Sequence, residues 1–141
     1  MPTARSSEAL VVTGVAGKRV LVTGASSGLG AHIANLFAGH GAHVTAAARR
    51  VSKIETLCAD ICAADGQAQA LKLDVSDPAS EQAALEAHSK DIVVNNAGVT
   101  HLPAPMETVS EDDFDRVLAV NAKSVYLTAR ELVPHMKAAG T

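Results

Sequence analysis

Three closely spaced glycines form a pattern that suits the binding of a phosphate group. Gly24, Gly28 and Gly30 follow directly after a short apolar run. Glycine lets the backbone turn sharply and approach a ligand, and free N–H groups at a helix start attract an anion. Ser26 and Ser27 lie between the glycines and could donate hydroxyl protons to a phosphate or a ribose. A plain turn between a strand and a helix would also account for the loop, so the loop alone leaves both interpretations open.

Two adjacent arginines, Arg49 and Arg50, follow the second apolar run of the chain. Where a nicotinamide dinucleotide binds, a carboxylate at this position usually meets a free ribose 2′-hydroxyl, and an arginine meets a 2′-phosphate. No carboxylate is available here, and a guanidinium can bind a phosphate through two parallel hydrogen bonds. If the chain holds such a dinucleotide, the pattern favours NADP over NAD, with Arg49 as the first choice for the phosphate. A solvated pair of arginines at a helix start is the alternative.

These residues need a framework of strands and helices to bring them together. Runs suited to strands lie over about 20–23, 43–47, 68–73 and 91–94. Helices are predicted over about 29–38, 52–64 and 77–88, and a long helix begins after Ser110. Strands that alternate with helices predict an α/β fold, a doubly wound parallel sheet of the Rossmann-like type. We expect a tail over residues 1–17 and one NADP-binding domain over residues 18–141.

Local signals predict how the helices begin and which faces they bury. Ser52 with Glu55 forms a capping-box pattern, and Ser110 with Asp113 predicts the cap of the last helix. Asn121 falls on an apolar stripe of that helix, where a polar side chain needs partners or costs stability. A satisfied amide that joins two elements would meet this need. The expected stripe consists of Phe114, Val117, Leu118, Val125, Leu132 and Met136.

Composition excludes several classes of protein. A net charge of −3 and 2% aromatic residues provide neither the basic field nor the stacking surface of a nucleic-acid binder. No apolar run approaches the length that spans a membrane, and the N-terminus lacks the apolar segment of a signal peptide, so we expect a cytoplasmic protein. Cys58 and Cys62 are expected to be reduced and buried, and the histidines have no spacing that would build a metal site.

Taken together, the motifs resemble those of the short-chain dehydrogenase/reductase family over about residues 18–141. The glycine loop runs Thr23-Gly24-Ala25-Ser26-Ser27-Gly28-Leu29-Gly30, and it is followed in order by Asp74-Val75, Asn95-Asn96-Ala97-Gly98 and Asn121. Four motifs, each at the end of the appropriate element, are more specific than one glycine loop.

The resemblance implies a role for each motif. The glycine loop would hold the cofactor pyrophosphate, with Thr23 at its start and Leu29 anchoring the helix against the sheet. Asp74 would contact the adenine, although an ordinary turn aspartate is an equal alternative. The segment of Asn96, Ala97 and Gly98 would line the cofactor crevice. The remaining motif residue, Asn121, would distort its helix and hold a water in a proton relay.

The implied activity is hydride transfer between nicotinamide and a carbonyl or alcohol substrate, in a protein that is a homo-oligomer at full length. The family's catalytic serine and its Tyr-x-x-x-Lys pair would lie beyond Thr141, so the resemblance implies a chain truncated after its long helix and inactive alone. Tyr126 with Arg130 only mimics that pair, and we expect Tyr126 to be a packing residue. A non-catalytic NADP-binding or interaction module is the alternative. A methyltransferase is disfavoured, because its ribose-binding strand also normally ends in a carboxylate.

Overall fold

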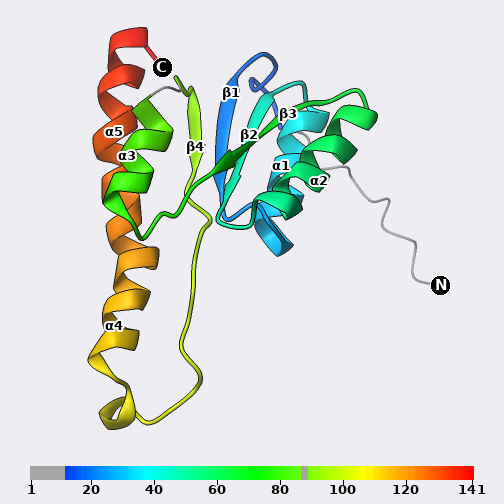
Figure 1. Cartoon of the computed structure of the whole chain (residues 1–141). Coiled ribbons are helices and arrows are strands. Elements are labelled where there is room, and N and C mark those ends of the chain that lie inside the picture. The colour runs from blue at the N-terminus through cyan, green and yellow to red at the C-terminus, as the bar shows by residue number, and fades with distance from the viewer. Residues whose placement is uncertain (1–11, 87–88) are drawn as a thin grey trace, which may run out of the picture.

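Strands and helices alternate along the chain as the sequence predicts. A computed structural model describes residues 12–86 and 89–141 (Figure 1). In chain order, the elements are β1 (Arg19–Thr23), α1 (Gly28–Gly39), β2 (His43–Ala48), α2 (Val51–Ala63), β3 (Gln67–Lys72), α3 (Pro78–Glu86), β4 (Ile92–Val94), a 3-10 turn η1 (Met106–Thr108), α4 (Glu111–Leu118), a π turn η2 (Ala119–Lys123) and α5 (Ser124–Ala139). Each predicted strand lies within one residue of its observed bounds.

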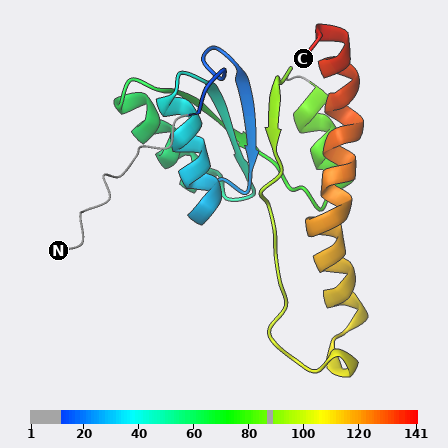
Figure 2. The same cartoon turned by 180° about the vertical axis from the view of Figure 1, so that it is seen from behind.

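The four strands form one sheet in the order β3-β2-β1-β4, and every neighbouring pair is parallel. Helices α1 and α2 cover one face, and α3 and α5 lie on the other (Figures 1 and 2). The predicted Rossmann-like, doubly wound α/β fold is therefore confirmed. Since all strands point the same way, their carboxyl ends share one edge of the sheet, where ligands bind in folds of this type.

Two apolar clusters hold the layers together, because successive strand residues point to opposite faces. On the α1 and α2 side, Val20, Val22 and Val44 pack with Ile54 and other buried residues of the helices. On the α3 and α5 side, Leu21 packs with residues that include Leu73, Leu85 and Leu132. The packing in these two clusters fixes the positions of the carboxyl ends of the strands relative to one another.

The first helix does not bury Leu29, the residue that we expected to anchor it, although Ile33 and Phe37 pack against the core. Leu29 is 68% exposed, so the prediction that it anchors α1 against the sheet is wrong. The buried residues are Gly30, Ala34 and Ala38, which recur every four residues. Small side chains on this face let the helix approach the strands closely. Leu29 precedes this face by one residue and therefore points toward solvent.

Two other local predictions about helix starts have opposite outcomes. Helix α2 begins at Val51 with Arg50 as its N-cap, so the predicted cap at Ser52 is wrong. An earlier start lets Val51 join the side of the helix that carries Ile54, which is buried. The predicted cap at Ser110 is confirmed, because its hydroxyl accepts a hydrogen bond of 3.1 Å from the Asp113 N–H.

Helices α4 and α5 form one long rod, interrupted by the π turn, and α4 projects past the carboxyl edge of the sheet (Figure 1). Most of the predicted apolar stripe is therefore not buried: Phe114, Leu118 and Val125 are exposed. The buried residues of α5 include Ser124 and Thr128, which satisfy their hydroxyls on backbone carbonyls one turn earlier, at 2.6 Å and 2.9 Å. Hydropathy alone misses such residues.

Two further predictions fail because side chains lie at the surface. Cys58 is buried, but Cys62 is exposed, so only one of the two thiols matches the expectation. Tyr126 is 61% exposed and lies beside the Arg130 guanidinium, so it is not a packing residue.

Parts of some predictions lie outside the described residues, namely residues 1–11 of the tail and the end of the third helix at His88. Within residues 12–17, Val15 is buried, and the Gly17 N–H donates to the Gly41 carbonyl at 2.8 Å. Among the described residues, no helix combines the length and the apolar character that crossing a bilayer requires.

Candidate functional site

A cavity of about 300 Å³ opens where the strands end at the carboxyl edge of the sheet. Five chain segments meet there: the ends of β1, β2, β3 and β4 with the loops that follow them, and the π turn. Its lining consists of Gly24, Ser26, Ser27, Ala48, Arg49, Arg50, Leu73, Asp74, Val75, Asn96, Ala97, Gly98, Val99 and Val120. Ten of the predicted cofactor-binding residues belong to this lining, so the structure brings together motifs that are far apart in the sequence.

Thr23 and Asn96 join the ends of β1 and β4 below the cavity. The buried Thr23 hydroxyl accepts from the backbone N–H groups of Asn96 and Ala97, both at 3.1 Å. In return, the Asn96 side-chain amide donates to the carbonyls of Thr23 at 3.1 Å and of Gly24 at 3.3 Å. Thr23 does not line the cavity, and its role in this structure is to position the residues that do.

Each of two glycines in the loop is required by a close contact. A Cβ on Gly24 would lie 2.8 Å from the Ala97 Cα, and Gly24 also has a φ of +65°. A Cβ on Gly30 would lie 2.4 Å from both the Asn96 amide nitrogen and the Gly24 carbonyl oxygen. Gly28 has open space around it but a φ of +59°. The glycine pattern therefore packs the start of α1 against the ends of β1 and β4.

The start of α1 meets the chemical requirements of an anion site. Ser27 is its N-cap in extended conformation, and no side chain caps the helix. The first N–H groups of a helix carry partial positive charge and need acceptors. Ser26 and Ser27, which directly precede this helix, both line the cavity.

Positive charge dominates the side of the cavity that follows β2. Arg49 and Arg50 both line it, and the Arg50 guanidinium donates to the Ser26 hydroxyl at 3.4 Å. Asp74, two residues after β3, lines the same cavity, and its carboxylate accepts from the Ser76 hydroxyl at 2.6 Å and from the Ser76 N–H at 3.0 Å. The Ser76 hydroxyl, chiefly, and the charge of Arg49 lower the pKa of Asp74. Asp74 therefore combines a turn-forming role with a place in the cavity wall.

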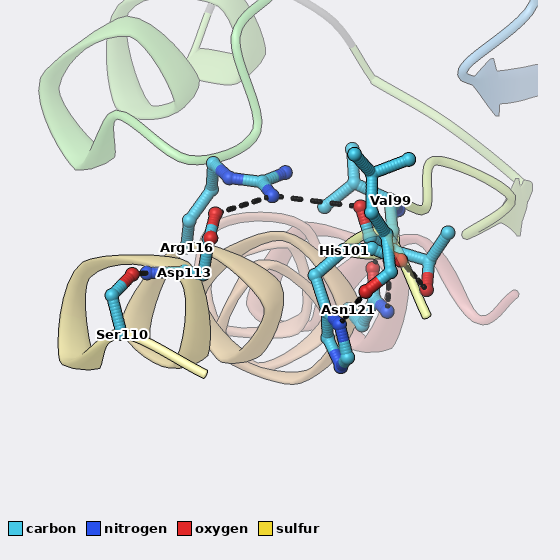
Figure 3. Close-up of polar contacts among 8 residues, drawn as sticks. Val99, His101, Ser110, Asp113, Arg116 and Asn121 are labelled. Carbon is cyan, nitrogen blue, oxygen red and sulfur yellow. Dashed lines mark hydrogen bonds and ion pairs between the residues drawn. The ribbon is translucent and has the colours of Figure 1, made fainter. Parts of the chain in front are cut away.

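Asn121 lies in the π turn and fixes the loop that follows the cavity (Figure 3). Its side-chain oxygen accepts from the Val99 N–H, and its amide donates to the Val99 carbonyl, both at 2.8 Å. The predicted distortion of the helix at Asn121 is present. The side chain is exposed and outside the cavity lining, so it acts on the site in this structure through Val99. A role in a proton relay stays a prediction.

A second contact ties the same loop to α4. The Arg116 guanidinium donates to the Asp113 carboxylate at 2.9 Å and to the Thr100 carbonyl at 3.5 Å (Figure 3). The ion pair with Arg116 lowers the pKa of Asp113. Loop residues beyond Gly98 therefore have their own attachments to the long helical rod.

Some of the predicted cofactor-binding residues lie outside the cavity lining, and some lining residues were not predicted. Gly28, Leu29 and Gly30, like Thr23, lie outside the lining. The missed residues are apolar or small: Ala48, Leu73, Val99 and Val120. Ala48 ends β2 and Leu73 directly follows β3, so their position at strand ends could have identified them. Val120 comes from the π turn, and no strand-end signal marks it.

A parallel sheet with a glycine loop and a helix start at its carboxyl edge is the arrangement of the Rossmann-type folds in which dinucleotide-binding proteins occur. The sequence model of the short chain dehydrogenases matches residues 18–141. The chain belongs to the short-chain dehydrogenase family, whose members are oxidoreductases.

Individual relatives support this assignment. The chain is 40% identical over 129 residues to D-threitol dehydrogenase of Mycolicibacterium smegmatis, covering 88% of this chain and 49% of that enzyme. A metagenomic short-chain oxidoreductase in complex with NADP is 38% identical, with a TM-score of 0.83 over 89% of this chain and 59% of that one. The 3-ketoacyl-(acyl-carrier-protein) reductase of Brucella melitensis, complexed with NADH, is 40% identical, with a TM-score of 0.82 over 89% and 53%. The chain spans about half the length of the curated relatives it matches.

Proposed function

We propose that this chain binds NADP and forms the cofactor-binding part of an oxidoreductase that acts on a carbonyl or alcohol substrate. The observation that carries the proposal is the pair Arg49 and Arg50 in the cavity wall directly after β2, where no carboxylate is present. Bound there, the cofactor would accept or deliver a hydride at its nicotinamide ring. Relatives of known structure include complexes with NADP and with NADH, so the choice of cofactor depends on this chain's own residues.

The residues of the cavity suit the parts of the dinucleotide in order. The N–H groups at the start of α1, with Ser26 and Ser27, would bind the pyrophosphate. Arg49 would bind the 2′-phosphate through paired hydrogen bonds, and Arg50 would support it from the Ser26 side. The Asp74 carboxylate would accept from the adenine amine. Val99, which is fixed by Asn121, would lie beside the nicotinamide half.

Binding of NADPH and NADH to this chain, followed by cofactor fluorescence, tests the proposal. We expect tighter binding of NADPH, and we expect Arg49→Ala to raise the Kd for NADPH by about tenfold to 100-fold, since a hydrogen bond to a charged group is worth ~1.5–3 kcal/mol. The same variant should change the Kd for NADH by no more than about twofold, because NADH lacks the 2′-phosphate.

Lys53→Ala is the matched control, because Lys53 is an exposed cation of α2 outside the cavity lining. It should leave both Kd values unchanged. A wild-type preference for NADH, or an equal loss of both cofactors in Arg49→Ala, would show that NADP is not the cofactor.

Hydride transfer separates the oxidoreductase from the non-catalytic alternative. D-threitol is the first substrate to test, because a D-threitol dehydrogenase is among the relatives at 40% identity. For this chain alone we expect cofactor binding without turnover, and for the chain joined to the remaining half of a family member we expect turnover. Binding without turnover in both cases would favour the non-catalytic module. We also propose that the protein is cytoplasmic and forms homo-oligomers at full length.

A further inference from the structure

Polar side chains occupy part of one sheet face, at the opposite end of the strands from the cofactor cavity. On the α3 and α5 side, alternation places Arg19, Thr45 and Gln69 on the same face as Leu21. Leu21 packs into an apolar cluster, but the residues nearer the amino ends of the strands are polar. Parallel sheets normally carry apolar residues on both faces. Polar residues on this part of the face are therefore unusual and point to a specific role.

Lys90, in the segment just before β4, extends its side chain into this region and is 4% exposed. Its ammonium group donates to the Thr45 hydroxyl at 2.6 Å. Within residues 12–86 and 89–141, Thr45 is its one hydrogen-bond acceptor, so two of its N–H donors remain available. A buried ammonium without a counter-ion is costly.

Thr45 adds a further donor to the same place. Its buried hydroxyl accepts from Lys90 and also from the Gln69 amide at 3.0 Å. With both contacts as acceptor, the hydroxyl keeps its own proton for donation. Two kinds of donor, an ammonium and a hydroxyl, therefore meet at one buried point.

The carboxylate of Asp91, the next residue in the chain, is already paired with another cation. Asp91 accepts from the Arg19 backbone N–H at 2.8 Å and from its guanidinium at 3.0 Å and 2.7 Å. Burial, and then the charge of Arg19, lower the pKa of Lys90, and Asp91 only partly opposes them. The charge of Lys90 therefore has no dedicated partner among the described side chains.

A cavity of about 350 Å³ lies over these groups. Arg19 and Lys90 both line it, together with amide and hydroxyl side chains that include Gln67 and Ser89, and no carboxylate is part of the lining. A cavity with this positive charge and these hydrogen-bond donors suits an anionic ligand with several acceptor oxygens. The volume of the cavity exceeds that of one small ion.

We propose that this cavity is a second anion site, distinct from the cofactor cavity, which binds a phosphate group through Lys90 and Thr45. The ligand is inorganic phosphate or the phosphate of a small metabolite. Lysine binds phosphate as a compact point charge, and the donors around it can satisfy several phosphate oxygens at once. A bound phosphate would supply the counter-ion that Lys90 lacks.

The test is a calorimetric titration of this chain with inorganic phosphate and, separately, with glycerol phosphate. We expect saturable binding. Lys90→Met keeps the length of the side chain but removes the charge, and Thr45→Val keeps the shape but removes the hydroxyl; each should raise the Kd for phosphate at least tenfold. Tighter binding of glycerol phosphate would identify a metabolite as the source of the phosphate.

Three variants establish whether phosphate binds in this cavity or elsewhere on the protein. Lys53→Met, at an exposed lysine on α2, should leave the phosphate Kd unchanged. The double variant Arg49→Ala/Arg50→Ala should also keep phosphate binding, because both arginines lie in the other cavity. Lys90→Met should fold, since losing an unpaired buried charge does not destabilise a core, and thermal unfolding checks this. An absence of saturable binding, its loss in the double variant, or its persistence in Lys90→Met would overturn the proposal.

Discussion

At the scale of single residues, the glycines of the first loop have different structural requirements. Gly30 needs the absence of a Cβ, because one would overlap the Asn96 amide and the Gly24 carbonyl at 2.4 Å. Gly28 needs only its backbone conformation, with a φ of +59° in open space. Gly98, in the later Asn-Asn-Ala-Gly segment, has neither a positive φ nor a contact tighter than 3.6 Å. Replacing each of these glycines with alanine should therefore lower the free energy of unfolding by a different amount.

We expect Gly30→Ala to lower the free energy of unfolding by about 2 kcal/mol or more, because overpacking costs roughly 1–3 kcal/mol and the Asn96 contacts would also be lost. Gly28→Ala should cost about 1 kcal/mol through its backbone conformation. Gly98→Ala is the matched control and should change stability by less than about 0.5 kcal/mol. Urea unfolding of the variants measures the order. Equal losses at all three positions would contradict the role given to Gly30.

At the scale of elements, the packing of α3 on α5 depends on a buried carboxyl group. Glu81 is fully buried and contacts the Thr128 hydroxyl, and its second oxygen has no hydrogen-bond partner among the described residues. Thr128 has one hydroxyl proton, and the Ser124 carbonyl lies within 2.9 Å of it. If that carbonyl takes the proton, Glu81 must be protonated and donate to Thr128. Burial raises the pKa of Glu81, and Glu131 adds to this, while Thr128 and Arg130 oppose it.

This arrangement predicts how stability depends on pH. The unfolded chain releases the Glu81 proton near pH 4.5, whereas the folded chain holds it to a higher pH. The contribution of the protonated Glu81 to the free energy of unfolding is therefore fully present below pH 4.5. It is lost as the pH rises through the raised pKa of Glu81 in the folded chain. Glu81→Gln keeps a donor for Thr128 and should flatten this loss, so that the variant is more stable than the wild type at pH 7.5.

Urea unfolding at several values between pH 4 and pH 9 checks the prediction for Glu81. Glu55→Gln, which replaces an exposed carboxylate on α2, is the control and should follow the wild-type profile. A Glu81→Gln variant that loses stability at neutral pH would mean that the carboxylate, and not the acid, is the native form.

At the scale of the whole molecule, the helical rod exposes apolar residues, and β4 ends the sheet. Phe114, Leu118 and Val125 are exposed on α4 and α5, and β4 pairs only with β1 among the described strands. Exposed apolar surface and an edge strand both favour association.

We therefore expect this chain to self-associate in a concentration-dependent way, as light scattering during size exclusion would show. The double variant Phe114→Lys/Leu118→Lys should shift the protein toward the monomer, because charge would oppose burial of this surface. Ala139→Lys adds a charge at the far, exposed end of α5 and should leave the association unchanged. A wild type that remains monomeric at high concentration would contradict the prediction.

The fold and most of the cavity lining could be predicted from the sequence because both depend on local signals. Apolar runs with glycine or arginine at their ends identified strand ends, and parallel strand ends share one edge. The burial of individual side chains was harder to predict. Leu29 and Phe114 are large apolar residues of the kind that form a core, but both are exposed. The contacts of Lys90 and Glu81 were not predictable, because they join elements whose packing no periodic pattern reveals.

The π turn at Asn121 has a consequence for how the chain tolerates insertions and deletions. A π turn holds one residue more than an α-helix would need and takes up that residue in a wider turn. Helices α4 and α5 therefore keep the phase of one continuous helix. Deleting one residue between Ala119 and Lys123 would close the turn into an unbroken α-helix without rotating α4 against α5, but it would remove the wide turn that presents the Asn121 amide to Val99. We therefore expect such a deletion to keep the rod and to lose its contact with the loop.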